Sequence, residues 1–275
     1  MNGQSARRAA GSALLLACLS SLAAAGRGQT GPAPVTPPAA SGDSAGPTLA
    51  QGMSALKENQ PREALNDFQR VLATDPNNVA ANLLASTSAV ELYQGPLAVQ
   101  FAERAERLDP GNWKIHTTLV AAYAAAGMKQ QRDHERAVLR DLHENGASDA
   151  RLATGFLVEM FPSGADRVDA IEYFEPVGRF HTYYRFVVRQ PDGKRIGEVD
   201  VQCDDFNQKS WAGAHPAEAA AGERQFQITG EGGDDGSPVD YRMFSGKLDY
   251  DNVRVMVVEA LRTHPVAGSQ ANAKP

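Results

Sequence analysis

The residues of this chain whose side chains could do chemistry lie far apart in the sequence. The histidines form no H-E-x-x-H pattern, and the two cysteines, Cys18 and Cys203, form no C-x-x-C pattern. The histidines are His116, His134, His143, His181, His215 and His264. Metal sites in proteins usually take their ligands from such short, clustered spacings. The sequence therefore predicts no metal centre and no cofactor.

Two acidic stretches invite comparison with calcium-binding loops. Residues 204–207, DDFN, lack the glycine and the distal glutamate of an EF-hand loop. Residues 230–236, GEGGDDG, are a single copy of a glycine/aspartate pattern. We expect a flexible acidic loop there and no calcium binding at either place.

Candidates for catalysis are few. The chain has no G-x-S-x-G motif, and Cys203, within an alternating stretch, is interpreted as a small core residue. Glu172 and Glu175 flank an aromatic pair and could act as acid and base in a cleft. Solvated charge on a sheet face is the favoured interpretation of this pair.

A polar row alternates with aromatic residues further along. His181, Tyr183 and Arg185 should share one face of a strand, with Tyr184 and Phe186 on the other. The row could bind a ligand or the helical part of the chain, and ordinary cross-strand packing is the favoured alternative. The sequence thus predicts no catalytic residues, and the chain is not expected to be an enzyme.

The elements that position these residues begin with a helical repeat. Pro76 and Pro110 lie 34 residues apart within the similar phrases ATDPNN and RLDPGN, which is the tetratricopeptide period. Counting back from Pro76 places Gly52, Ala64 and Phe68 where that repeat has glycine, alanine and phenylalanine. Over residues 47–146 the chain therefore resembles tetratricopeptide-repeat proteins, with two to three repeats.

The resemblance implies an all-α solenoid that holds another polypeptide on its concave surface. By phase the first helix of each pair lines this surface, and the predicted binding residues are Met53, Lys57, Leu83, Thr87, Glu91, Thr117 and Ala121. The lining is mostly apolar or small, so an extended or helical apolar segment of a partner is the expected ligand. The alternative is that the chain's own C-terminal part fills this groove.

The third repeat departs from the pattern. Arg132 and Arg136 stand where alanines would be expected, in a polar helix over residues 129–145. Solenoids usually end in a repeat with a wetter outer face. We therefore expect this helix to be the solvent-facing cap of the array.

After Gly146 the hydrophobic period changes from 3.6 to 2, which predicts an antiparallel sheet over residues 147–264 and an α+β fold. Phe156, Val158 and Met160 alternate on one strand. A second alternating set comprises Phe180, Thr182, Tyr184, Phe186 and Val188.

Later strands are expected through residues 199–203, at 224–229 and at 239–244, followed by a helix after Asp249 or Asp251 that packs on the sheet. The sheet segment carries AIEYFE at residues 170–175 and YDNVR at residues 250–254. Together with the repeats these look like a group of exported bacterial tetratricopeptide proteins with no assigned activity. That resemblance implies an architecture only.

Residues 1–25 have the features of an export signal. Arg7 and Arg8 precede an apolar run at 13–19 and a small AAA segment at 23–25. The run is too short to span a bilayer. Soluble export, periplasmic or secreted, is the favoured interpretation; the alternative is a lipoprotein anchored through Cys18 in the segment LLAC.

Residues 26–46 are predicted to be a disordered linker and residues 265–275 a disordered tail, because their composition lacks large apolar side chains. Removing residues 1–25 takes away two arginines and no acid, so the formal charge goes from −6 to −8. Nucleic acids are bound through clustered Lys and Arg, so this charge argues against a nucleic-acid partner.

The sequence thus favours an exported, non-catalytic adaptor that binds another envelope protein or peptide. The alternative is a sheet domain that binds or modifies a small molecule and is recruited by the repeats. A deep pocket lined by convergent polar groups would favour the alternative.

Overall fold

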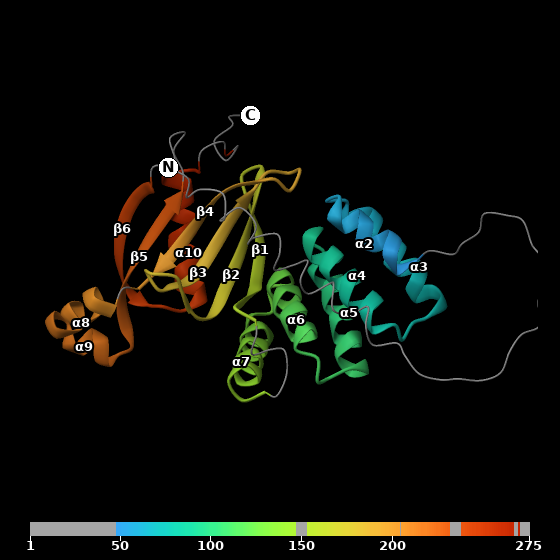
Figure 1. Cartoon of the computed structure of the whole chain (residues 1–275), viewed down its shortest axis with the longest axis horizontal. Helices are drawn as coiled ribbons and strands as arrows, with labels where there is room; N and C mark the ends of the chain where they lie inside the picture. The colour runs from blue at the N-terminus through green and yellow to red at the C-terminus, as the bar shows by residue number, and fades with distance from the viewer. Residues whose placement is uncertain (1–47, 147–152, 204, 232–237, 267–268, 270–275) are drawn as a thin grey trace, which may run out of the picture.

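The computed structural model describes residues 48–146, 153–203, 205–231, 238–266 and 269. Within these residues a set of helices is followed by a six-stranded antiparallel sheet and a C-terminal helix (Figure 1), so the predicted α+β class is confirmed. The predicted export signal, the linker and residues 267–268 and 270–275 of the predicted tail lie outside the described residues, whereas Val266 of that tail is buried in the hydrophobic core of the sheet part. None of the described helices combines the length and apolarity needed to cross a bilayer.

The N-terminal helices pack in sequence order, each against the next, and α2, α4 and α6 also contact one another in order. We call them the helical array: α2 (Leu49–Lys57), α3 (Pro61–Thr74), α4 (Val79–Glu91), α5 (Gly95–Leu108), α6 (Trp113–Ala125) and α7 (Lys129–Asn145). Figure 1 shows the array lying beside the sheet.

The turns of the array repeat as the sequence predicts. Asn59, Tyr93 and Gly127 have positive φ values of 57°, 55° and 72°, and each follows the first helix of its pair at an interval of 34 residues. Asn78 and Asn112 cap α4 and α6 by accepting backbone N–H hydrogen bonds, also 34 residues apart. Side-chain caps satisfy helix N–H groups that have no partner within the helix. The 34-residue spacing seen in the sequence therefore recurs in the backbone conformation of the turns and in the helix caps.

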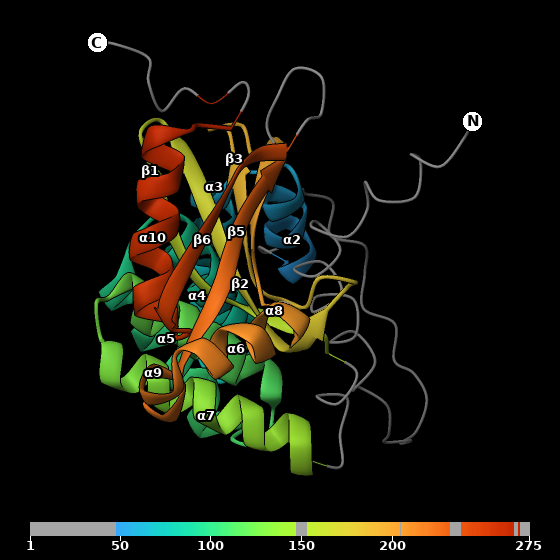
Figure 2. The same cartoon turned by 90° about the vertical axis from the view of Figure 1, so that its left-hand side faces the viewer.

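The sheet is a meander in which each strand pairs with its sequence neighbour. Its strands are β1 (Gly155–Ser163), β2 (Asp166–Val177), β3 (Thr182–Arg189), β4 (Arg195–Gln202), β5 (Glu223–Glu231) and β6 (Pro238–Lys247). The helix α10 (Tyr250–Thr263), capped by Asp249, lies across one face of the sheet (Figure 2). Two helices between β4 and β5, α8 (Asp205–Ala214) and α9 (Pro216–Ala220), were not predicted from the sequence.

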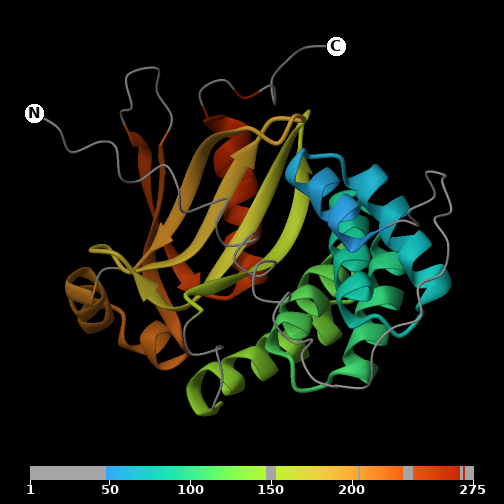
Figure 3. The same cartoon turned by 45° about the vertical axis from the view of Figure 1, so that its right-hand side comes forward.

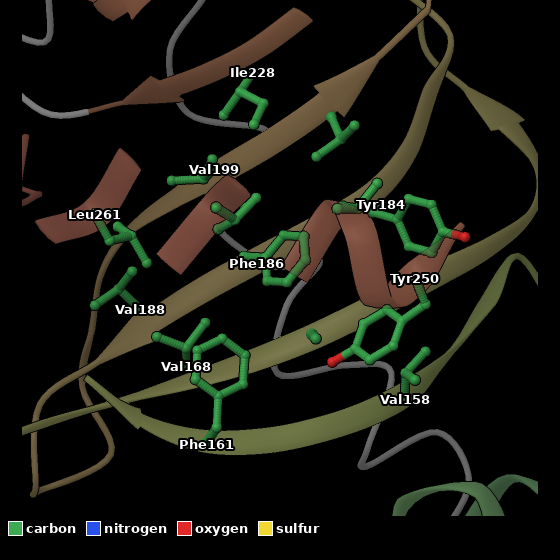
Figure 4. Packing of buried hydrophobic residues seen from close by; sticks show 14 of the residues in the cluster. Val158, Phe161, Val168, Tyr184, Phe186, Val188, Val199, Ile228, Tyr250 and Leu261 are labelled. Carbon is green, nitrogen blue, oxygen red and sulfur yellow. The ribbon is translucent and has the colours of Figure 1, made fainter. Parts of the chain in front are cut away.

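The main core lies between α10 and the sheet. Figure 4 shows Phe161, Phe186 and Leu261 meeting in it. Val120 of α6 and Leu139 of α7 are fully buried in the same cluster. The array and the sheet thus share one core.

The strand faces differ from the prediction at two places. A register shift between Leu157 and Glu159 reverses the alternation of β1, because a bulge adds one residue to one strand. Phe156 therefore packs with the α10 core and Met160 with the array. Phe180, which the alternation groups with residues 182 to 188 on one side of a strand, lies instead in the turn before β3 and is 56% exposed.

The last helix of the array is not the solvent-facing cap that the sequence predicted. The side chain of Arg132 is only 4% exposed and its Nη1 lies 3.0 Å from Asp251 of α10. Arg136 Nε lies 2.7 Å from Glu172 of β2, and Arg140 pairs with the same carboxylate. The arginines that break the repeat pattern therefore dock α7 on the sheet part.

Glu172 is likewise not the solvated charge that was predicted. It is 1% exposed, because it points toward the α10 side of the sheet where α7 covers it. Glu175, three residues on, is exposed. The two carboxylates therefore do not form an acid–base pair in a common cleft.

Candidate binding cavity between the helical array and the sheet

A partly open cavity of about 100 Å³ lies where the array meets the sheet. Its walls come from α4 and α6 on one side and from β1, β2 and β3 on the other. β1 packs directly against α6, and Figure 3 shows the array against the β1 edge of the sheet. The chain's own sheet therefore covers much of the predicted groove and leaves this cavity within it.

The helical wall follows from helix periodicity. On α4 the lining residues Leu83, Thr87 and Val90 recur at intervals of four and three, and on α6 Lys114, Thr117 and Ala121 recur at intervals of three and four. Such spacing puts side chains on one face of a helix. Apart from Lys114 these residues are apolar or small, so most of this wall offers packing surface.

The sheet wall has an apolar part and a polar end. Met160 and Ile171 belong to the apolar part. At the polar end Asp169, 2% exposed, accepts a hydrogen bond of 2.6 Å from Arg189 Nε, and Arg167 Nε lies 2.9 Å from its other oxygen. Both arginines therefore share one buried carboxylate.

Glu91 ends α4 near this cluster. Burial raises the pKa of its carboxyl; Arg167 and Arg189 act in the opposite direction, and Asp169 adds to the rise. The charged residues that line the cavity are thus Asp169 and Arg189 at its polar end and Lys114 on α6, with Arg167 and Glu91 beside the polar end.

The structure brings together most of the residues predicted to bind. Leu83, Thr87, Thr117 and Ala121 line the cavity, and Glu91 lies within electrostatic reach of its polar end. Met53 and Lys57 of α2 are not among the lining residues. Met53 packs against the core formed by α2, α3 and α4, and Lys57 is exposed.

The sheet side of the cavity was missed from the sequence. Met160, Asp169, Ile171 and Arg189 have the pattern of ordinary strand residues, and no local motif marks them. Alternation tells which strand residues share a face, but it does not tell which face the array covers. The bulge in β1, which turns Met160 toward the array, has no sequence signal of its own.

A second contact joins the array to the sheet part. Asn59 Nδ2, in the turn between α2 and α3, donates a hydrogen bond of 3.2 Å to the carbonyl of Pro191 in the β3–β4 turn. Gly193 of that turn has φ 82°, and a Cβ on it would lie 2.8 Å from the Asn59 side chain. The array thus touches the sheet part through its first turn as well as through α6 and α7.

The polar row predicted on one strand face is only partly formed, because His181 lies in the turn before β3 with φ 50°, whereas Tyr183 and Arg185 lie on β3. Arg185 makes two hydrogen bonds of 2.8 Å to Asp200 of β4 and lies over the ring of Tyr173. Cross-strand pairs of this kind stabilise a sheet. Cys203 is buried with its Sγ 3.3 Å from the carbonyl oxygen of Gln225, which agrees with a core role.

No known protein family and no curated protein matches this chain.

Proposed function

We propose that this protein is an exported, non-catalytic adaptor that holds a peptide segment of another envelope protein by accepting one apolar side chain into the cavity between α4, α6 and the sheet. The observation that carries the proposal is the size and lining of this cavity. Its walls are mainly apolar, and the buried carboxylate at its polar end, Asp169, is held by Arg167 and Arg189.

The volume suits a single apolar side chain. An apolar cavity of roughly 150 Å³ holds benzene, and this partly open cavity is somewhat smaller, at about 100 Å³. One aliphatic or aromatic side chain anchored in a pocket is a common way for a peptide to be held.

The polar groups support binding more than catalysis. Asp169 is held by both Arg167 and Arg189, and Arg189 also donates to the carbonyl of Gly193 at 3.2 Å. Because these charged groups already bind one another, they are suited to forming a fixed wall of the cavity. The predicted export signal supports the envelope as the place where this binding occurs.

Selection of a random peptide library on the immobilised full chain tests the proposal. We expect the enriched peptides to share one large apolar position and to bind the variant Ala121→Leu at least tenfold more weakly. Leucine at this position would fill the cavity, so the variant should be at least as stable as the wild type. Ala73→Leu, at an exposed position on α3, is the matched control and should leave binding unchanged.

Two results would count against the adaptor. Either no peptides are enriched over a blank surface, or the enriched peptides bind Ala121→Leu as tightly as they bind the wild type. The melting temperature of each variant shows whether a loss of binding comes from the filled cavity or from unfolding.

A further inference from the structure

A second cluster of side chains lies inside the array, apart from the cavity. It consists of Glu106 in the last turn of α5, His116 in the first turn of α6, and Glu135 in α7. One ligand atom from each of the three lies within 4.8 Å of the others. In the sequence these residues are 10 and 19 positions apart, so only the packing of three helices brings them together.

The imidazole of His116 is oriented on both sides. Its Nδ1 lies 2.7 Å from Glu135 Oε2, and its Nε2 lies 3.3 Å from the backbone carbonyl of Pro110. A carbonyl accepts only, so Nε2 carries a proton and donates it. Metal-binding histidines are typically held in this way, with one ring nitrogen donating to a carbonyl while the other faces the metal.

The protein balances the charge of the cluster only in part, because His116 pairs with Glu135 at 2.7 Å and the Glu106 carboxylate is left over. Among the described residues neither Glu106 nor Glu135 has a lysine or arginine within ion-pair distance. Asp169 and Glu172, two other buried carboxylates, are each held by two arginines. With a protonated imidazole the cluster carries a formal charge of −1, and with a neutral imidazole −2.

Even partial burial of an uncompensated carboxylate costs free energy. A divalent cation bound by a neutral imidazole and two carboxylates would bring the formal charge of the cluster to zero. Glu135 and His116 are buried, at 6% and 7% exposure, whereas Glu106 is half-buried, so an ion could enter from the Glu106 side.

We propose that Glu106, His116 and Glu135 form a binding site for a divalent transition-metal ion, and that zinc suits the ligand set best. One imidazole nitrogen and two carboxylate oxygens are donors that zinc accepts, and three protein ligands leave a fourth position for water. Calcium prefers six to eight oxygen ligands. On binding, the ion takes the place of the Nδ1 proton, which leaves to solvent.

The site would tie the last three helices of the array together. α7 carries the arginines that dock on the sheet part, so an ion at this position would stabilise the docked helix. Ligand binding to the folded state alone raises the melting temperature. A rise in melting temperature with zinc is therefore a second readout, independent of any function of the cavity.

Calorimetric titration of the chelator-treated full chain with zinc chloride at neutral pH tests the proposal. We expect one zinc ion per chain with a dissociation constant in the micromolar range or tighter, and no comparable heat with calcium. Glu106→Gln should weaken zinc binding at least tenfold, because it removes one ligand charge from a half-buried position without breaking a helix contact.

Glu103→Gln is the matched control. It removes the same charge from the same helix, and the amide oxygen of the substituted side chain can still accept the 3.1 Å hydrogen bond that Tyr123 donates to Glu103. Zinc binding by this variant should equal that of the wild type. Absence of saturable zinc binding, or equal affinity in Glu106→Gln and wild type, would overturn the proposal.

Discussion

The second helices of the first and last repeats, α3 and α7, occupy equivalent places in the array and are built in opposite ways. α3 buries Ala64, Leu65, Phe68 and Leu72 against α2 and α4, a contact without charge. α7 presents arginines to the sheet part, with Leu139 as its fully buried apolar residue. The comparison indicates that one helical frame serves two purposes: internal packing at the start of the array, and docking through ion pairs at its end.

The largest expected effect comes from disrupting the apolar packing of α3 against α2 and α4. Phe68 is fully buried, and a Cβ at Gly52 would lie 2.5 Å from its ring, which explains the glycine opposite it. Phe68→Ala should lower the free energy of unfolding by about 3–5 kcal/mol, as lost burial and a cavity combine. Denaturant unfolding followed by circular dichroism measures this loss.

Gln69→Ala, at the exposed neighbouring position, is the control and should stay within about 0.5 kcal/mol of the wild type. Hydrogen exchange should localise the damage to α2 and α3. Equal effects of the two substitutions would mean that Phe68 is not the central packing residue of the first repeat.

The next largest effect is expected from disrupting the ion pairs that join α7 to the sheet part. Glu172→Gln leaves Arg136 and Arg140 without their shared carboxylate, and removal of one member of a buried ion pair usually costs about 3 kcal/mol or more. We expect a loss of about 3 kcal/mol by denaturant unfolding, with exchange protection lost in α7. Glu175→Gln, exposed on the same strand, should be nearly neutral; a similar loss in both variants would argue against a docking role for Glu172.

The sequence predicted much more of α3 than of α7. The apolar spacing of Ala64, Leu65 and Phe68 identifies a buried helix face directly, because the partner surface belongs to the same repeat. The arginines of α7 carry no comparable signal. A charged residue at a repeat position indicates a solvent-facing side chain unless its partner carboxylate, here more than 30 residues away at Glu172, is known.

The same limit applies to the cavity. Helix phase predicted Leu83, Thr87, Thr117 and Ala121 as one surface, and the structure places them in one wall. The opposite wall depends on how β1 to β3 lie against that surface, and this is decided by tertiary packing, which local sequence does not reveal. The YDNVR segment shows this as well: Asp251 pairs with α7, and Tyr250 and Arg254 both donate to Glu159, contacts that its letters do not reveal.

Among the described residues, one polar link joins the first repeat to the sheet part. Asn59→Gly keeps a residue that tolerates φ 57° and removes only the hydrogen bond to the carbonyl of Pro191. We expect a loss of about 0.5–1 kcal/mol. Asn77→Gly, exposed in the next turn, controls for the added chain entropy of glycine. A difference between the variants of several kcal/mol would show that the first repeat also docks strongly.

The smallest expected effect is a pH dependence of stability that the ion pairs of α7 should show and those of α3 should not. Burial acts to raise the pKa of Asp251, but hydrogen bonds from Arg132 and Lys129 outweigh it and hold this pKa below its ordinary value. A carboxyl with a lowered pKa in the folded state stabilises the fold above its unfolded pKa of about 3.9 and loses that contribution as the pH falls through the folded value. The stability difference between wild type and Asp251→Asn should therefore be present at pH 6, begin to shrink as the pH drops below about 3.9, and vanish once the pH is below the folded pKa.

Asp67→Asn on α3 removes a partner of the solvent-exposed Arg70 within a single helix, and such pairs contribute little. Its stability difference from wild type should stay near zero at pH 6. Urea unfolding of the three proteins at pH 6, 4 and 3 makes the measurement. A pH-independent difference for Asp251→Asn would mean that α7 is held by packing around Leu139 and not by its ion pairs.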